Sequence, residues 1–201
     1  MRITKTLFIS AVLLMSATGL QAAGFIQKGN YLTVQLKEHQ NYGPSQIRLQ
    51  VVNDQIIRVQ ATAEQSFRNK QSLIIVPQNS KANYKVEEQG DKLIITTAAM
   101  RAVLNEATGQ ITFYDLKDNV LLNEVAQGGK TFKPFTVPDR EIGVDIAKVP
   151  EAQKHGWSWR ALFDSPDNEA FYGLGQHQSE ELNMKGKNED LFQYNTKVSV
   201  P

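Results

Sequence analysis

The feature that most constrains this chain is an alternation of apolar and polar residues with a period of two. Such alternation is typical of strands with one buried face, because successive side chains of a strand point to opposite faces of its sheet. The sequence contains no long amphipathic helical pattern, internal repeat or low-complexity tract. The alternating runs are residues 31–36, 46–51, 55–60, 83–87, 92–96, 102–104, 110–114 and 120–122.

Tight polar turns separate neighbouring runs. Asn53-Asp54, Gly90-Asp91 and Thr108-Gly109 each lie between two alternating segments. Short connections of this kind are typical of antiparallel hairpins. Many short strands joined by such turns favour an all-β fold, and within that class an antiparallel β-sandwich.

The second half of the chain is less regular. Residues 126–156 carry Gly and Pro among mixed charges, which predicts irregular strands and long loops. The alternation returns at residues 157–163 and predicts one further strand. We expect Phe171-Tyr172 to end a strand and residues 173–175 to form a turn in which Gly permits positive φ. This Gly-Leu-Gly segment does not complete a dinucleotide fingerprint, since it lacks a third Gly and a helical pattern after it.

Residues 1–22 are typical of a secretory signal peptide. A short basic start precedes the apolar run 7–15, which is too short to span a bilayer because a span needs about 20 apolar residues. We expect cleavage after Ala22, since Leu20 and Ala22 occupy the positions that the peptidase reads. The mature domain is then residues 23–201, periplasmic or secreted, with no membrane attachment. An uncleaved anchor or a buried first helix are the alternatives.

The charge balance excludes several function classes. The chain has 22 basic and 21 acidic residues, and Arg2 and Lys5 are the only charges of the leader, which leaves 20 basic residues in the mature chain. This near-neutral balance is not the basic footprint of a nucleic-acid or membrane-surface binder. The chain has no Cys, so its stability must come from a sizeable core rather than from disulfides. No clustered set of His, Cys and carboxylate ligands predicts a metal, and we expect no cofactor.

Two motifs in the last third of the chain resemble those of glycoside hydrolase family 31. Residues 171–176 (Phe-Tyr-Gly-Leu-Gly-Gln), preceded by Asn168-Glu169, resemble the family's aromatic-Tyr-Gly-Leu-Gly-Glu signature. Lys185-Gly186 followed by residues 191–195 (Leu-Phe-Gln-Tyr-Asn) resembles the next block, which leads toward the active site. The family includes α-glucosidases, α-xylosidases and related transglycosylases. The resemblance implies a β-sandwich of the galactose-mutarotase-like kind.

The resemblance also implies a chemistry. Family members use a retaining mechanism in which two carboxylates lie about 5–5.5 Å apart, one as nucleophile and one as acid/base. Both are Asp residues of a (β/α)₈ barrel that follows this domain, and residues 1–201 stop before it. We therefore expect an N-terminal fragment with an incomplete sandwich and no catalytic residue. The acids Glu180, Glu181, Glu189 and Asp190 lie in polar sequence and are expected to be solvated.

Three residues are candidates for substrate binding through the resemblance, namely Asn195, His177 and Gln176. Asn195 stands where many α-glucosidases place an Asp that binds the non-reducing sugar, and Gln176 stands where Glu is usual. These departures argue against a simple transfer of α-glucosidase specificity. The Gly-Leu-Gly-Gln-His-Gln and Gln-Tyr-Asn-Thr segments are most similar to those of exported bacterial members that act on α-xylosides of xyloglucan fragments. His177 could contact a sugar hydroxyl or have a structural role.

Trp157 and Trp159 are two residues apart, so they share one face of a strand. They could stack on sugar rings, although a place in the core or at a domain interface is favoured for large aromatics.

The leading functional hypothesis is the N-terminal part of an exported α-glycosidase that removes terminal α-linked xylose or glucose from oligosaccharides. The alternatives are a free-standing carbohydrate-binding sandwich and a structural exported β-protein without a ligand. Residues 197–201 end the sequence in an apolar alternating run, and further sandwich strands follow this point in the family. We therefore expect residues 23–201 alone to oligomerise or express poorly through an open sheet edge.

Overall fold

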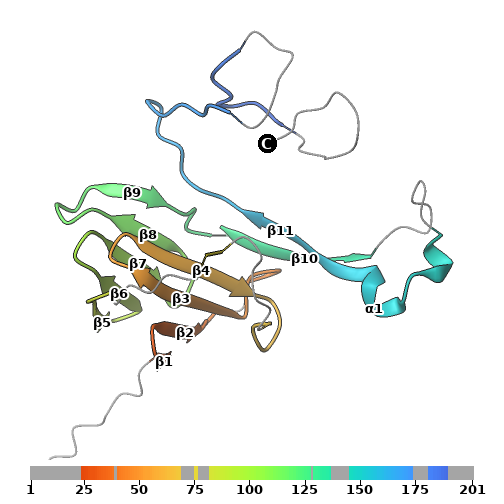
Figure 1. Cartoon of the computed structure of the whole chain (residues 1–201), viewed down its shortest axis with the longest axis horizontal. Helices are drawn as coiled ribbons and strands as arrows, with labels where there is room; N and C mark the ends of the chain where they lie inside the picture. The colour runs from red at the N-terminus through yellow and green to blue at the C-terminus, as the bar shows by residue number, and fades with distance from the viewer. Residues whose placement is uncertain are drawn as a thin grey trace, which may run out of the picture.

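The computed structural model of the chain describes residues 24–38, 40–68, 75–76, 82–127, 129–136, 145–173 and 181–189. Antiparallel β-structure dominates these residues, as Figure 1 shows. The helical segments among them are the 3₁₀ turn η1 (Ile146–Lys148) and the single turn α1 (Glu151–Lys154). The all-β prediction is confirmed. The predicted signal peptide lies outside the described residues.

The first sheet is a four-stranded antiparallel meander in the order β1-β2-β3-β4. Burial alternates along β2 and β3, where Leu32 lies opposite Leu49 and Val34 opposite Ile47. Asn53 closes the turn before β4, since its side-chain oxygen accepts from the Gln55 amide at 2.9 Å. The strands are β1 (Phe25–Lys28), β2 (Tyr31–Gln35), β3 (Gln46–Asn53) and β4 (Ile56–Thr62).

The second sheet is a five-stranded antiparallel meander in the order β5-β6-β7-β8-β9. Its turns at Gly90 and Gly109 fall at the predicted places, and both glycines have positive φ. Its strands are β5 (Lys85–Gln89), β6 (Lys92–Thr96), β7 (Arg101–Asn105), β8 (Ile111–Tyr114) and β9 (Val120–Asn123).

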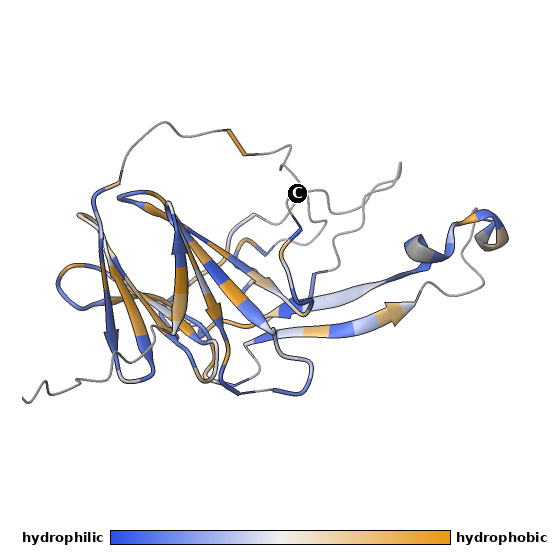
Figure 2. Ribbon diagram, turned by 90° about the horizontal axis from the view of Figure 1, so that it is seen from below, coloured by the Kyte–Doolittle hydropathy of each residue, from blue (hydrophilic) through white to orange (hydrophobic). Residues whose placement is uncertain are grey.

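The core forms where these two sheets face each other (Figures 1 and 2). Each sheet directs every second side chain inward, which is the physical meaning of the period-two pattern. Burial of one such aliphatic side chain stabilises the fold by about 1.5–3 kcal/mol relative to leaving it exposed. The fully buried members are Leu32, Val34, Ile47, Leu49, Val51, Leu93, Ile95, Leu104 and Ile111.

A two-stranded ribbon extends from the sandwich (Figure 2). It consists of β10 (Lys130–Thr136) and β11 (His155–Ala161). Backbone hydrogen bonds beyond β11 join it to the end of the second sheet: the Val125 amide donates to Leu162 O at 3.1 Å, and the Asp164 amide donates to Asn123 O at 2.9 Å. Residues 126–156 contain the regular strand β10, where we expected irregular strands. The strand β11 begins at residue 155, two residues before the predicted start at 157.

The prediction that Phe171-Tyr172 ends a strand is wrong. These residues lie in a loop held by a neighbouring segment, because Phe171 O accepts from the Met184 amide at 2.8 Å and the Phe171 amide donates to Asn183 Oδ1 at 3.1 Å. Gly173 does have positive φ, as the sequence predicted. The rest of the predicted turn, residues 174–175, lies outside the described residues.

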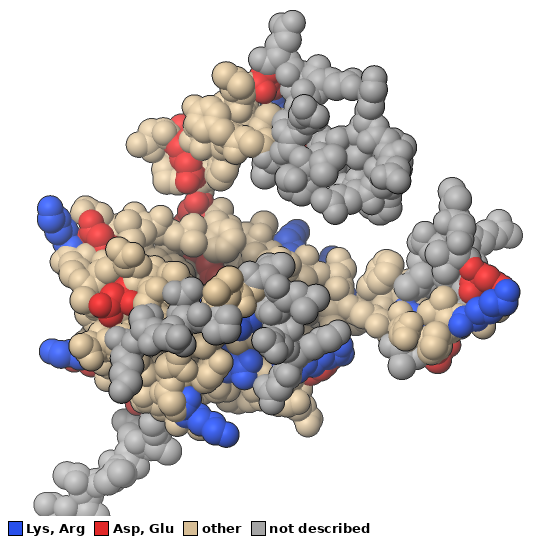
Figure 3. Space-filling view, in the orientation of Figure 1, with Lys and Arg blue, Asp and Glu red and all other residues tan. Residues whose placement is uncertain are grey.

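Charges of both signs are interspersed on the face that Figure 3 shows. This agrees with the small net charge of +1 for the whole chain. The described surface on that side thus presents no extended field of one sign. No helix among the described residues is long and apolar enough to cross a membrane.

The turn glycines give a test of sandwich packing. A Cβ at Gly109 would lie 2.9 Å from Leu36 Cδ1 and 3.0 Å from Ile47 Cδ1, whereas a Cβ at Gly90 would meet nothing within 4 Å. We expect Gly109→Ala to lower the free energy of unfolding by about 2–4 kcal/mol through backbone strain and overpacking together. The control Gly90→Ala should lower the free energy of unfolding only by the cost of backbone strain, about 1–2 kcal/mol. Urea unfolding measures both, and equal losses would contradict this packing.

Candidate functional site

The three predicted substrate-binding residues, Gln176, His177 and Asn195, lie outside the described residues. Their assignment therefore stays a prediction. The two predicted tryptophans are described, and both lie on β11 with side chains open to solvent. Trp157 is 44% exposed and Trp159 is 62% exposed. Of the two favoured places, the core and a domain interface, this exposure excludes the core. A domain interface and sugar stacking remain as alternatives.

The tryptophans line a groove of about 1060 Å³ between the end of β4 and the β10–β11 ribbon. We call it the aromatic groove. Its β4 side is formed by residues 59–64 with Phe67 and Arg68, and its other side by the ribbon. A hollow of this size with mostly apolar walls and a few polar groups is typical of a binding site. The aromatic side chains that line it are Phe67, Phe132, Phe135, Trp157, Trp159 and Phe163.

The register of the ribbon explains why its aromatic residues gather. Phe132 lies opposite Trp159, and Pro134 lies opposite Trp157. Residues directly opposite each other in an antiparallel pair project from the same face, so these four form one continuous apolar surface. Sequence reasoning found the Trp157–Trp159 half of this surface but missed the Phe132–Pro134 half. The signal was the same period of two, within a segment that its Pro and Gly content led us to expect as irregular.

The polar groups around the aromatic groove are mostly held in pairs. Arg68 Nη2 lies 2.7 Å from Glu64 Oε1, and this hydrogen bond lowers the pKa of Glu64, with a smaller contribution from the Trp157 indole. His155 lies 2.9 Å from Glu151 Oε1 through Nε2 and 3.2 Å from Thr136 Oγ1 through Nδ1. Lys154, followed by His155, lowers the pKa of Glu151.

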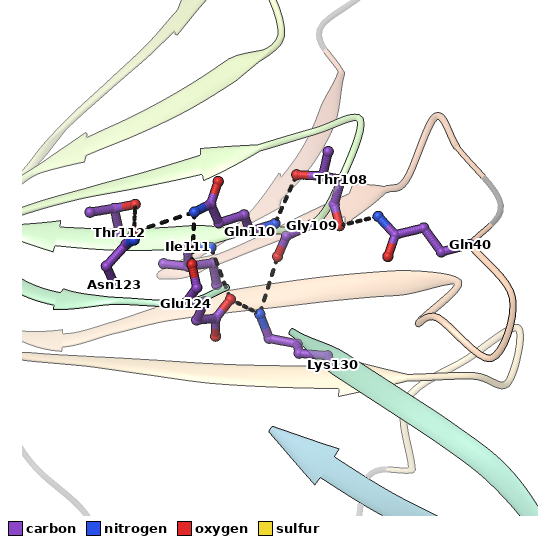
Figure 4. Close-up of polar contacts among 9 residues, drawn as sticks. All are labelled: Gln40, Thr108, Gly109, Gln110, Ile111, Thr112, Asn123, Glu124 and Lys130. Carbon is purple, nitrogen blue, oxygen red and sulfur yellow. Dashed lines mark hydrogen bonds and ion pairs between the residues drawn. The ribbon is translucent and has the colours of Figure 1, made fainter. Parts of the chain in front are cut away.

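Glu124 and Lys130, which both line the aromatic groove, form a buried ion pair. Figure 4 shows its contacts. The side chains of Lys130 and Glu124 are 7% and 6% exposed, and Lys130 Nζ contacts Glu124 Oε2. The same carboxylate oxygen accepts from the Ile111 amide at 2.9 Å, and Nζ also donates to Gly109 O at 3.1 Å. These extra hydrogen bonds offset part of the cost of removing two charges from water.

The pKa of Lys130 is lowered by burial, while the Glu124 carboxylate acts in the opposite direction. Both acids that line the aromatic groove, Glu64 and Glu124, are thus engaged with cations. The groove can therefore offer a bound partner aromatic faces and hydrogen-bonding groups. Its two described acids are paired with cations and so have a structural role. Among the residues that the structure describes, no group of three or more His, Cys, Asp or Glu side chains could hold a metal ion.

Residues 46–201 match the family model of the glycosyl hydrolase 31 N-terminal galactose mutarotase-like domain. The chain belongs to glycoside hydrolase family 31. The matched region includes β3 and β4 of the first sheet, the whole second sheet, the ribbon and the aromatic groove. It also includes the two motifs on which the resemblance rested, and the predicted galactose-mutarotase-like sandwich is confirmed.

Individual family 31 proteins are similar over most of this chain. The α-xylosidase of Xanthomonas citri is 34% identical with a TM-score of 0.70, over 87% of this chain and 17% of its own. An α-xylosidase from a soil metagenome, complexed with xylose, is 26% identical with a TM-score of 0.59, over 88% of this chain and 26% of its own.

A family 31 glucosidase of Pseudescherichia vulneris, itself uncharacterised, is 24% identical over 164 residues, which are 77% of this chain and 30% of that protein. The chain thus spans less than a third of the length of each of these relatives.

The ion pair in the aromatic groove gives a second test. We expect Lys130→Met to lower the free energy of unfolding by about 3–5 kcal/mol, because it leaves a buried carboxylate without its cation. Adding Glu124→Gln should restore much of this loss, since a neutral amide oxygen can still accept from Ile111. The control Arg68→Met breaks an exposed pair and should leave the free energy of unfolding nearly unchanged. Similar losses for the single and double Lys130 variants, measured in urea, would refute this account.

Proposed function

We propose that this chain forms the N-terminal domain of an exported α-glycosidase that releases terminal α-linked xylose from oligosaccharides, with α-linked glucose as the second candidate. The observation that carries the choice is the 34% identity and TM-score of 0.70 with an α-xylosidase over 87% of the chain. A second α-xylosidase supports it at 26% identity. The pattern of residues 1–22 supports export.

In this proposal the domain positions substrate, and the two carboxylates of a retaining mechanism come from a catalytic barrel. The segment from Gln176 to Asn195 shapes the mouth of the active site. Asn195 would hydrogen-bond a hydroxyl of the terminal sugar, since an amide can donate and accept at once. Gln176 and His177 are the further candidates for substrate contact. No cofactor is required, because two-carboxylate hydrolysis needs none.

We assign the aromatic groove to contact with the catalytic part of the same enzyme. The chain spans 17% of the length of the Xanthomonas relative, so most of such an enzyme would lie outside this domain. Exposed, contiguous aromatic surface is typical of protein–protein contacts. The exposed Trp157 and Trp159, and Phe132 and Pro134 opposite them, provide such a surface. The competing occupant is an oligosaccharide stacked on the tryptophans, as a free-standing carbohydrate-binding module would have it.

The proposed substrate is tested by measuring the kinetics of the whole enzyme of which this domain is proposed to be a part. We expect hydrolysis of 4-nitrophenyl α-xyloside with a higher kcat/KM than that of the matching α-glucoside. Asn195→Ala should lower kcat/KM by about tenfold or more, the value of one hydrogen bond to substrate. The control Asn83→Ala changes an exposed asparagine before β5, outside this segment, and should leave kcat/KM unchanged. Preference for the glucoside, or equal effects of both substitutions, would contradict the assignment.

The role of the aromatic groove is tested in the same enzyme. Trp159→Ala should lower its melting temperature, because it removes a large apolar contact between domains. The control Leu121→Ala changes a similarly exposed apolar residue on β9 and should have little effect. Calorimetric titration with xyloglucan oligosaccharides should show no binding that depends on Trp159. Saturable binding lost in Trp159→Ala, with an unchanged melting temperature, would favour the carbohydrate-binding alternative.

A further inference from the structure

A second groove lies on the outer face of the second sheet. It crosses β5, β6, β7 and β8, which lie side by side in Figure 1, and has a volume of about 470 Å³. Ile94 and Val103, opposite each other on β6 and β7, form its apolar floor. They alternate with the core residues Leu93, Ile95 and Leu104 and therefore face away from the core. We call this hollow the outer groove. Among the described residues, it shares no lining residue with the aromatic groove.

Arg101 and Tyr114 form a fixed side of the outer groove. They are opposite each other on β7 and β8, and Arg101 Cζ lies 4.7 Å from the centre of the Tyr114 ring. Arg101 Nη1 is also 2.6 Å from Asp118 Oδ1. Arg101 Nε makes no hydrogen bond within the part of the chain that the structure describes. The guanidinium is thus held by two contacts before any ligand arrives, which lowers the entropy lost on binding.

The other side chains of the outer groove include several that are available to a ligand. Glu87 and Gln89 come from β5, and Lys92 and Thr96 come from β6. Their side chains make no hydrogen bond or ion pair with another described residue. A carboxylate accepts, an ammonium group donates, and an amide or a hydroxyl group does both. The groove therefore offers donors and acceptors together, above an apolar floor.

The charges of the outer groove favour a ligand without net charge. Asp115 accepts from two backbone amides of its own turn, both at 2.8 Å, and Asp118 pairs with Arg101. The charged side chains that remain are Glu87 and Lys92, which have opposite signs. An anion in the groove would be repelled by the first and a cation by the second. A neutral ligand with many hydroxyl groups meets neither penalty.

We propose that the outer groove binds a short segment of a neutral oligosaccharide, at residues other than those expected to contact the cleaved sugar. Sugar hydroxyls donate and accept at once, as the polar groups here require, and the apolar faces of sugar rings match Ile94 and Val103. The volume lies in the range of about 300–1,000 Å³ that is typical of ligand sites. The ligand class follows from the groove itself, and only the choice of sugars for the test rests on the function proposed above.

The test is affinity electrophoresis of the whole enzyme through gels that contain either xyloglucan or dextran. We expect at least one of these polysaccharides to retard the enzyme. Thr96→Val and Gln89→Ala should each weaken this binding by about two- to tenfold, the value of one hydrogen bond to a neutral ligand. Thr96→Val removes a hydroxyl group at nearly constant volume. Gln89 is exposed, so its substitution reports on the groove even if Thr96→Val fails to fold.

The matched controls Thr33→Val and Gln50→Ala make the same changes on the outer face of the first sheet and should leave the retardation unchanged. The retardation should persist at high salt, because contacts with a neutral ligand are little screened.

Retardation by neither polysaccharide, or equal losses at the groove and control positions, would overturn the proposal. Loss of retardation at high salt would also overturn it, since binding would then depend on charge. None of these results depends on which aryl glycoside the enzyme hydrolyses, so this proposal and that of α-xyloside hydrolysis can fail separately.

Discussion

The buried pair between Glu124 and Lys130 determines where the ribbon lies, and with it the shape of the aromatic groove. Glu124 follows β9 and Lys130 begins β10, so the pair closes the connection from the second sheet to the ribbon. Its hydrogen bonds to Ile111 and Gly109 fix both charges to the beginning of β8. A displaced ribbon would strand two charges in a poorly solvated place, which is far more costly than the loss of one apolar contact.

The same region shows why a turn residue can matter to a distant surface. Gly109 allows the β7–β8 turn to approach Leu36 and Ile47 of the first sheet, and its carbonyl accepts from Lys130. Gln40 adds a further contact, donating to Thr108 O at 3.0 Å (Figure 4). The turn therefore connects both sheets and the ribbon. The contacts of this turn therefore affect both the packing of the core and the position of the aromatic groove.

The sandwich strands could be predicted because each carries its own period-two signal. Seven of the eight alternating runs coincide with an observed strand over at least four residues or over their full length. The run 83–87 is the exception, since the observed strand is shifted by two residues, to 85–89. The strand β1 was missed since its exposed residues Ile26–Lys28 do not alternate in burial. A regular strand was not predicted for β10, because Pro134 and the nearby Gly residues disfavour strands. Pro is tolerated there because a two-stranded ribbon has free edges.

The aromatic groove was harder to predict, because no single segment contains it. Its walls come from β4, β10 and β11, which are separated by many residues in sequence, and only the register Phe132–Trp159 joins the aromatic pairs. The family motifs pointed instead to Gln176, His177 and Asn195, which follow the described sandwich residues in sequence. A family motif lies within one short segment and can be found there, whereas the aromatic groove is formed only when distant strands come together.

Glu124 and Glu106 show what a buried carboxylate needs in this fold. Both are almost fully buried and follow a strand of the second sheet, yet Glu124 has a lysine and a backbone amide on one oxygen, while Glu106 has Lys37 on Oε2 and no donor on Oε1. The difference lies in the donors that reach each group: Lys130 and the Ile111 amide both bind Oε2 of Glu124, whereas Glu106 receives Lys37 alone. A buried carboxylate is stabilised only as far as its donors compensate for the water it has lost, so Glu106 is the less stabilised of the two.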